Sequence, residues 1–104
     1  MTKVYIAGPM TGIEDFNYPA FNAAAAALTE RGFTPLNPVD NDTEGQQATW
    51  NWYMRAALRQ VVDADAMCLL PGWQSSTGAN LEVAVGEALK LDIRPLDEWL
   101  KVKI

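Results

Sequence analysis

The 104-residue chain contains no histidine, and this absence removes more chemistry than any other feature of its composition. Ser-His-Asp and Cys-His catalytic systems, and metal sites with imidazole ligands, all require that side chain. Cysteine is nearly absent too: Cys68 is alone, which excludes an internal disulfide bond and a thiolate metal cluster. Because Cys68 lies in the apolar run 66–70, we expect a buried small side chain.

Long apolar runs and clustered basic residues are also missing. No stretch approaches the roughly 20 apolar residues of a membrane-spanning helix, and the N-terminal residues lack a signal-peptide pattern. We therefore expect a cytoplasmic protein without a membrane partner. Thirteen acidic residues against eight scattered basic ones give a net charge of -5, which disfavours binding to polymeric nucleic acid.

The chain does contain enough apolar residues, 49%, for one compact core, so we expect a single domain over residues 1–104. Short β-branched or aromatic runs alternate with amphipathic segments. Strands are predicted at 4–7, 33–36, 66–70 and 93–96, and helices at 19–31, 49–62 and 78–90. This order predicts a small three-layer α/β sandwich, with a mostly parallel sheet of four to five strands, flavodoxin- or Rossmann-like.

Several details of this fold follow from local pattern. The uninterrupted apolar run 66–70 predicts a central strand, and Pro35 predicts a strand at an edge or a strand end. The segment 37–48, rich in Asn, Asp, Gly and Gln, is expected to be a mobile or functional loop that covers a ligand. We expect the two later helices to bury these apolar stripes: Trp50, Met54, Ala57, Leu58 and Val61, and Leu81, Ala84, Val85, Ala88 and Leu89.

Two segments follow predicted strands, where parallel sheets bind their ligands. In the run 8–12, Gly8 and Gly12 permit close backbone approach to an anion, but a tight turn explains them equally well. Their spacing matches neither a dinucleotide-binding motif nor a P-loop.

The run 75–82 opens a helix with hydroxyls, a glycine and a carboxylate. Free amides at a helix start bind anions, and Ser76 or Thr77 would add hydroxyl donors; alternatively, one of them only caps the helix. Glu82 does not have the spacing of a capping box, so its position needs another reason or is chance. A carboxylate in a strand-end crevice is suited to attack an anomeric carbon.

The runs 4–10 and 76–82, with Ala64-Asp65 before the central strand, resemble the nucleoside 2-deoxyribosyltransferase superfamily. More closely, Leu70-Pro71-Gly72-Trp73 followed by Ser76-x-Gly78-Ala79-x-x-Glu82 is similar to its small branch DUF4406, which is common in phages and prophages. The resemblance covers nearly the whole chain.

The resemblance implies that Glu82 is the nucleophile that displaces a base from 2-deoxyribose, giving a glycosyl-enzyme that water or another base resolves. It implies that Tyr5 orients Glu82, and that Gly8 and Pro9 border the substrate. Relatives that hydrolyse deoxynucleoside monophosphates carry Ser facing phosphate where this chain has Ser76. We therefore expect a nucleoside or nucleotide substrate, held at its 5′ end by Ser76, Thr77 and the amides near Gly78, with no metal or other cofactor.

One departure from the family concerns the helix before the central strand. The family usually has an Asp that assists proton handling at the base, and the matching residue here is Ala57. Arg55, Asn51, Asp40 or Asp42 are candidates to replace it, and the sequence does not select among them. The alternative to an enzyme is a catalytically weak or inactive nucleotide-binding protein.

Other residues admit two readings each. Asp63 and Asp65 could hold Mg²⁺, although acids beside a strand start are more often solvated. Trp52 and Tyr53 could form a subunit contact, so a homo-oligomer is expected, and a structural or regulatory module would use the same surface. Trp73 could stack on the base or simply pack within its loop.

Overall fold

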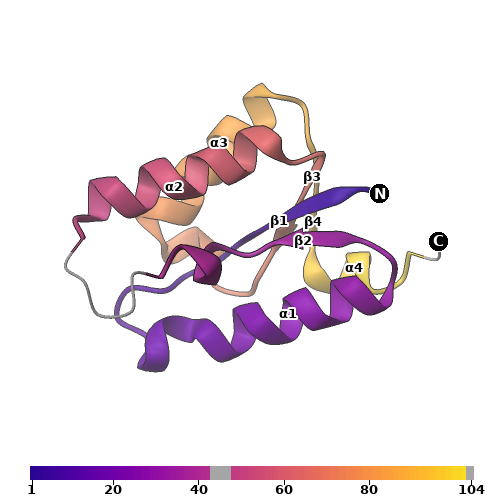
Figure 1. Ribbon diagram of the computed structural model, residues 1–104, viewed down its shortest axis with the longest axis horizontal. Helices are drawn as coiled ribbons and strands as arrows, with labels where there is room; N and C mark the ends of the chain where they lie inside the picture. Colours follow the sequence, from indigo (N-terminus) through magenta and orange to yellow (C-terminus); the bar gives the residue numbers. More distant parts are fainter. Residues whose placement is uncertain (43–47, 103–104) are drawn as a thin grey trace.

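A computed structural model describes residues 1–42 and 48–102. The strands are β1 (Lys3–Ala7), β2 (Thr34–Leu36), β3 (Ala66–Leu69) and β4 (Asp92–Pro95). The α-helices are α1 (Tyr18–Glu30), α2 (Trp50–Asp63), α3 (Thr77–Ala88) and α4 (Leu96–Trp99), and three short 3₁₀ helices are η1 (Glu14–Asn17), η2 (Pro38–Asn41) and η3 (Trp73–Ser75). Figure 1 shows α2 and α3 on one side of the sheet and α1 and α4 on the other.

The sheet has four parallel strands in the order β2-β1-β3-β4. The predicted α/β sandwich is therefore confirmed. Pro35 pairs with Val4 in the edge strand β2, and β3 lies between β1 and β4, both as expected from the sequence. Among the described residues, no helix is long and apolar enough to cross a membrane.

Strand alternation divides the core between the two faces of the sheet. Val4 and Ile6 of β1 pack with Cys68 on the side that α1 and α4 cover. Tyr5 and Ala7 point to the opposite side, under α2 and α3. Cys68 is buried, as its apolar neighbours predicted. The Tyr5 side chain therefore lies between the sheet and the layer formed by α2 and α3.

The short helix α4, which has no counterpart among the predicted elements, closes the α1 side of the core. Trp99 of α4 is buried, and its indole Nε1 donates a hydrogen bond to the Met67 carbonyl at 2.9 Å. Its ring meets Phe33 edge-on at 5.2 Å, and the Arg94 guanidinium lies 5.0 Å from the ring centroid. The buried indole thus ties the last helix to the central strand.

The stripe predicted to be buried on α3 is wrong. The buried residues are Ala79, Glu82, Val83 and Gly86, whereas Leu81 and Leu89 are 41% and 47% exposed. This helix is built mostly of small and apolar residues on every side, so its periodicity does not choose a face. Gly86 lies on the buried face, where Met67 and Ile93 leave no room for a larger side chain at that position.

On α2 the prediction holds for Met54, Ala57 and Val61, which are buried, but not for Trp50, and Leu58 is only half-buried. Trp50 is the first residue of the helix, and half of its surface, 51%, is exposed. The first turn of α2, which begins with Trp50, precedes the first buried residue of the helix, Met54, so the apolar pattern of the sequence begins before the part of the helix that contacts the core.

Candidate functional site

The candidate site lies at the carboxyl ends of β1 and β3. Strand β1 lies between β2, which follows it in the chain, and β3, which follows β2, so the order of the strands reverses at β1. In parallel sheets, ligands bind outside the strand ends at such a reversal. Gly8 and Pro9 follow β1 there and are buried. A Cβ atom on Gly8 would lie 2.8 Å from the Leu70 Cβ, so the two strand ends approach closely only because residue 8 is glycine.

Glu82 lies on the buried face of α3, one helical turn after Gly78 and one turn before Gly86. A Cβ on Gly78 would stand 3.1 Å from the Met54 sulfur of α2, and one on Gly86 would stand 2.8 Å from Met67 Cε of β3. The two glycines therefore let α3 lie close against both α2 and the sheet. Glu82, between them, is only 7% exposed.

The Glu82 carboxyl and the Tyr5 hydroxyl are neighbours. Burial raises the pKa of Glu82 to about 8, and a hydrogen-bonding interaction with Tyr5 acts in the opposite direction. Burial, followed by the Glu82 charge, raises the pKa of Tyr5 well above 10, so the phenol stays protonated. The Tyr5 oxygen is nonetheless the one buried side-chain polar atom among the described residues without a hydrogen bond of good geometry. The pair can therefore still accept a third polar group.

The start of α3 is capped by Ser76, which is one of the two readings given by the sequence. Ser76 caps the helix, with its Oγ accepting a hydrogen bond from the Ala79 amide at 3.1 Å. Asn80 Nδ2 donates to the Gln74 and Ser76 carbonyls at 2.9 and 2.8 Å, which fixes the preceding turn. The hydroxyl hydrogen of Ser76 and the first-turn amides of Thr77 and Gly78 have no acceptor within the helix, so they can serve an anion.

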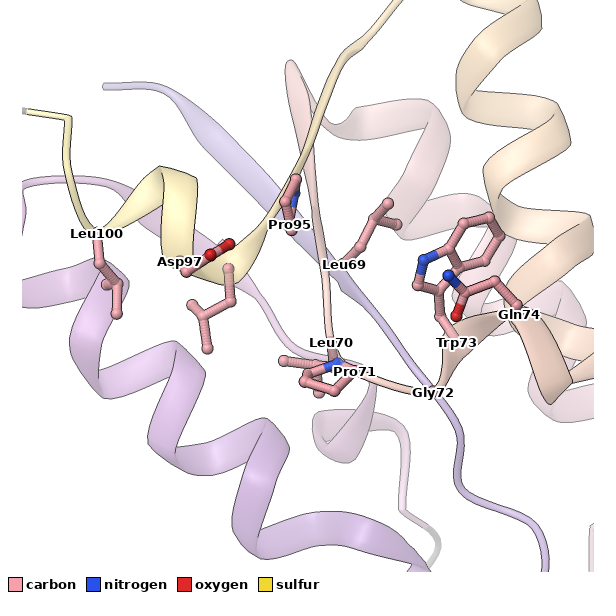
Figure 2. Close-up of a pocket in the computed structure, with 10 residues that line it drawn as sticks. Leu69, Leu70, Pro71, Gly72, Trp73, Gln74, Pro95, Asp97 and Leu100 are labelled. Atoms are coloured by element: carbon pink, nitrogen blue, oxygen red, sulfur yellow. The ribbon is translucent and has the colours of Figure 1, made fainter.

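Trp73 lies in η3, half-buried against the core cluster that contains Tyr5. It also lines a hollow of about 470 Å³ at the ends of β3 and β4. Figure 2 shows Trp73 and Gln74 on one side of the β3 end and Asp97 and Leu100 on the other. Among the described residues, neither Glu82 nor Tyr5 lines this hollow. Trp73 thus packs against the core cluster that contains Tyr5, and another part of its side chain faces the hollow.

A strained turn, which the sequence analysis missed, follows the loop after β1. Asp15, Phe16 and Asn17 have φ angles of 53°, 52° and 62°, a left-handed conformation that costs non-glycine residues of order 1 kcal/mol each. Asn17 Nδ2 donates to the Pro9 carbonyl at 3.0 Å and so ties the turn to the strand end. Phe16 is left 61% exposed. The only sequence signal was the Asn and Asp content of this turn, because both residues tolerate this conformation.

The short helix η2 packs against both α1 and α2. Tyr18 begins α1, and its hydroxyl interacts electrostatically with the Asp42 carboxyl and with Tyr53 of α2. Burial and then the Asp42 charge raise the pKa of Tyr18 above 10. The expected loop 37–48 is thus, in its described part, a short helix with a fixed end; residues 43–47 of that prediction lie outside the described residues.

Ala57, at the position where the resemblance led us to expect an aspartate, is buried in the cluster with Tyr5 and Val61. Arg55, one of its candidate replacements, instead lines an outer groove on α2 together with Arg59. Arg55 therefore lies on the outer side of α2, away from Ala57 and Tyr5.

Asp63 and Asp65 both interact with Lys3. Lys3 Nζ is 3.2 Å from Asp63 Oδ2, and the Lys3 amide donates to Asp65 Oδ2 at 2.9 Å. The part of the chain that the structure describes contains no group of three potential metal ligands. The two aspartates thus bind Lys3 and help to hold β1 beside the start of β3.

Two solved enzymes share this fold. The 2-deoxyribosyltransferase of Bacillus psychrosaccharolyticus matches with a TM-score of 0.70 and 19% identity, over 89% of this chain and 70% of that one. The 2-deoxyribosyltransferase of Leishmania mexicana matches with a TM-score of 0.69 and 19% identity, over 91% of this chain and 63% of that one. The chain therefore has the fold of the 2-deoxyribosyltransferases, as the resemblance implied.

The family model described as "Domain of unknown function (DUF4406)" matches residues 2–94. The chain belongs to this family. No curated protein sequence matches it.

The raised pKa of Glu82 predicts how stability depends on pH. The folded state holds the proton more tightly than the unfolded chain does, so this stabilisation is complete below about pH 4.5 and is lost as the pH rises through about 8. Glu82→Gln, which stays neutral, should gain roughly 2–5 kcal/mol over the wild type between these pH values. Urea unfolding at several pH values measures this difference.

The exposed Glu87 on the same helix provides the control, because Glu87→Gln should follow the wild type at every pH. A stability difference between Glu82→Gln and the wild type that does not change with pH would contradict the buried carboxyl.

Proposed function

We propose that the protein cleaves or exchanges the N-glycosidic bond of a 2′-deoxynucleoside or its 5′-monophosphate, with Glu82 as the nucleophile. The observation that carries this proposal is the carboxyl of Glu82, buried beside the Tyr5 hydroxyl on the face of the sheet that α2 and α3 cover. A buried carboxyl costs stability, and groups of this kind with strongly shifted pKa values are concentrated at functional sites. The fold shared with two 2-deoxyribosyltransferases supports the same chemistry.

In the proposed reaction, a Glu82 carboxylate oxygen bonds to the anomeric carbon of the sugar. The bond from that carbon to the base breaks, and its electron pair goes to the base nitrogen, which is protonated from solvent. Water or a second base then attacks the same carbon and releases Glu82. Tyr5 remains protonated, so it can donate a hydrogen bond that holds the carboxylate in position.

The start of α3 supports a 5′-phosphate on the substrate. From Thr77 to Glu82 the helix rises about 7.5 Å, which is comparable with the span from a 5′-phosphate to the anomeric carbon of a nucleotide. The Ser76 hydroxyl and the Thr77 and Gly78 amides are donors at one end of this span, and Glu82 is at the other. We assign Gly8 and Pro9 to the border of the sugar, with no metal or cofactor required.

Trp73 has a smaller part in this proposal. It packs against the cluster that contains Tyr5 and thereby supports the strand end under the sugar. Its open face at the neighbouring hollow leaves it able to contact the substrate as well.

A nucleotide-binding protein without turnover is the second candidate, and Ala57 is the observation that favours it. Alanine has no carboxylate, so no acid acts from this position, and the Ala57 methyl group is packed in the core instead. Such a protein would keep the anion site at Ser76 and the buried Glu82 but would release no base.

We also propose that two or more copies of the chain associate through the outer face of α2. Trp52 and Val62 are exposed there, and Leu58 lies between Arg55 and Arg59 in a groove of about 380 Å³. Exposed apolar groups gathered on one helix face are typical of a protein contact.

The first test is base release. Wild-type protein incubated with deoxynucleoside monophosphates should liberate free base, detected by chromatography, and Glu82→Gln should lower kcat by at least roughly a hundredfold, because the nucleophile is removed. Glu87→Gln should keep the wild-type rate. Calorimetric binding without base release would instead establish the nucleotide-binding candidate.

The second test concerns Tyr5. Because kcat/KM reports the pKa of the free enzyme, it should rise with pH through about 8 as Glu82 ionises. Tyr5→Phe removes the group that lowers the Glu82 pKa, so the midpoint should move to higher pH. The variant should unfold at a temperature close to that of the wild type, since the lost hydroxyl has no well-formed hydrogen bond. An unchanged midpoint would show that Tyr5 does not act on Glu82.

The third test concerns assembly. Val62→Lys adds a charge to the proposed contact at a residue that is largely exposed, so it should dissociate the oligomer without unfolding the chain. Sedimentation velocity measures the change, and Ala26→Lys on the opposite side, on α1, should leave the mass unchanged. A monomeric wild type would refute the contact.

A further inference from the structure

We infer that the hollow at the ends of β3 and β4 is a second binding site, and that it takes a primary amine carried on an aromatic body. Its volume of about 470 Å³ falls within the range of roughly 300–1,000 Å³ that small-molecule sites occupy in proteins. Neither Glu82 nor Tyr5 lines it, so the hollow lies apart from the proposed catalytic pair. A ligand held there is therefore distinct from the substrate of the proposed reaction.

The hollow exists because the chain leaves the two strands toward different sides (Figure 2). After β3, Gly72 has a φ of 86°, a left-handed conformation that favours glycine, and the chain turns into η3. After β4, which ends at Pro95, the chain enters α4 at once. Trp73 thus stands on one side of the strand ends and Asp97 on the other.

Both walls of the hollow are held in place from within the fold. The Trp73 amide donates to the Leu70 carbonyl at 3.3 Å, and the Trp73 side chain packs against the core cluster that contains Tyr5. On the other side, the buried Trp99 indole ties α4 to the Met67 carbonyl. A site with fixed walls binds its ligand without the entropic cost of ordering them.

The lining of the hollow determines the charge of the ligand. Among the described residues, no basic side chain lines the hollow, which disfavours a phosphate or a carboxylate there. Arg94, which precedes Pro95, instead binds Asp92 through Nε and Nη2, both at 2.9 Å, and lies over Trp99. The Asp97 carboxylate lines the hollow and has no hydrogen-bond or ion-pair partner within the described part of the chain. An ammonium group can donate to this carboxylate and neutralise it.

The apolar part of the lining determines the body of the ligand. Leucine and proline side chains form most of the surface, and the Trp73 indole stands on the side away from Asp97. An aromatic ring packs favourably on an indole and is removed from water there. Because Trp73 and Asp97 lie on different sides of the strand ends, we assign the ring and the ammonium group to the two ends of one elongated molecule, an arylalkylamine.

The test compares three probes of similar shape: the 2-phenylethylammonium cation, the neutral 2-phenylethanol and the anionic 3-phenylpropionate. Binding is followed by the NMR signal of the Trp73 indole N–H, which Trp73→Phe identifies among the four tryptophans of the chain. The ammonium probe should shift this signal and bind at least about threefold more tightly than the alcohol, and the anion should bind most weakly. Equal affinities for the three probes, or a Trp73 signal that the ammonium probe does not move, would overturn the site.

Asp97→Asn removes the charge at nearly constant size, so it should lower the affinity for the ammonium probe by roughly three- to tenfold and leave that for the alcohol unchanged. Glu98→Gln is the matched control, because Glu98 is the adjacent exposed acid of α4 and does not line the hollow. It should bind like the wild type, and so should Glu82→Gln. An unchanged affinity in Asp97→Asn, or an equal loss in Glu98→Gln, would refute the role of Asp97. Base release is measured separately, so the proposed function stands or falls independently of these results.

Discussion

The close approach of α3 to the sheet is the constraint on which the site depends. Gly78 and Gly86 bring the helix against Met54 and Met67, and Glu82 between them loses its water. Burial then sets the chemistry of the carboxyl, because it favours the protonated form and makes the neighbouring Tyr5 hydroxyl the main polar group that can oppose this effect. A larger side chain at either glycine would have to displace one of these methionines, so packing and reactivity are linked at this one face.

Sequence reasoning recovered what local pattern encodes. The alternation of strands and helices, the edge position of Pro35 and the central strand with Cys68 all follow from short-range rules. The face that α3 buries could not be predicted, because small apolar residues surround Glu82 on all sides of the helix. Likewise, nothing near Trp99 indicates that its indole reaches the carbonyl of a residue 32 positions earlier.

The candidate site, too, has one part that the sequence predicts and one part that depends on contacts between distant segments. The pairing of Tyr5 with Glu82 and the capped start of the helix at Ser76 lie within recognisable motifs. The position of η2 depends on contacts between segments far apart in the chain: Asn37 bonds to a residue 15 positions away and Gln60 to one 23 positions away. Amide side chains of this kind are common in loops, and only the folded chain shows which of them meet.

The edge strand β2 has a consequence for assembly. The Thr34 amide donates toward β1, to the Thr2 carbonyl at 2.9 Å, so the backbone of the next residue, Pro35, faces away from the sheet. Proline has no N–H, and this outer margin therefore offers a neighbouring polypeptide an acceptor without its matching donor. A further strand added at the β2 edge of the sheet would thus miss one hydrogen bond of its ladder, which disfavours growth of the sheet from this edge.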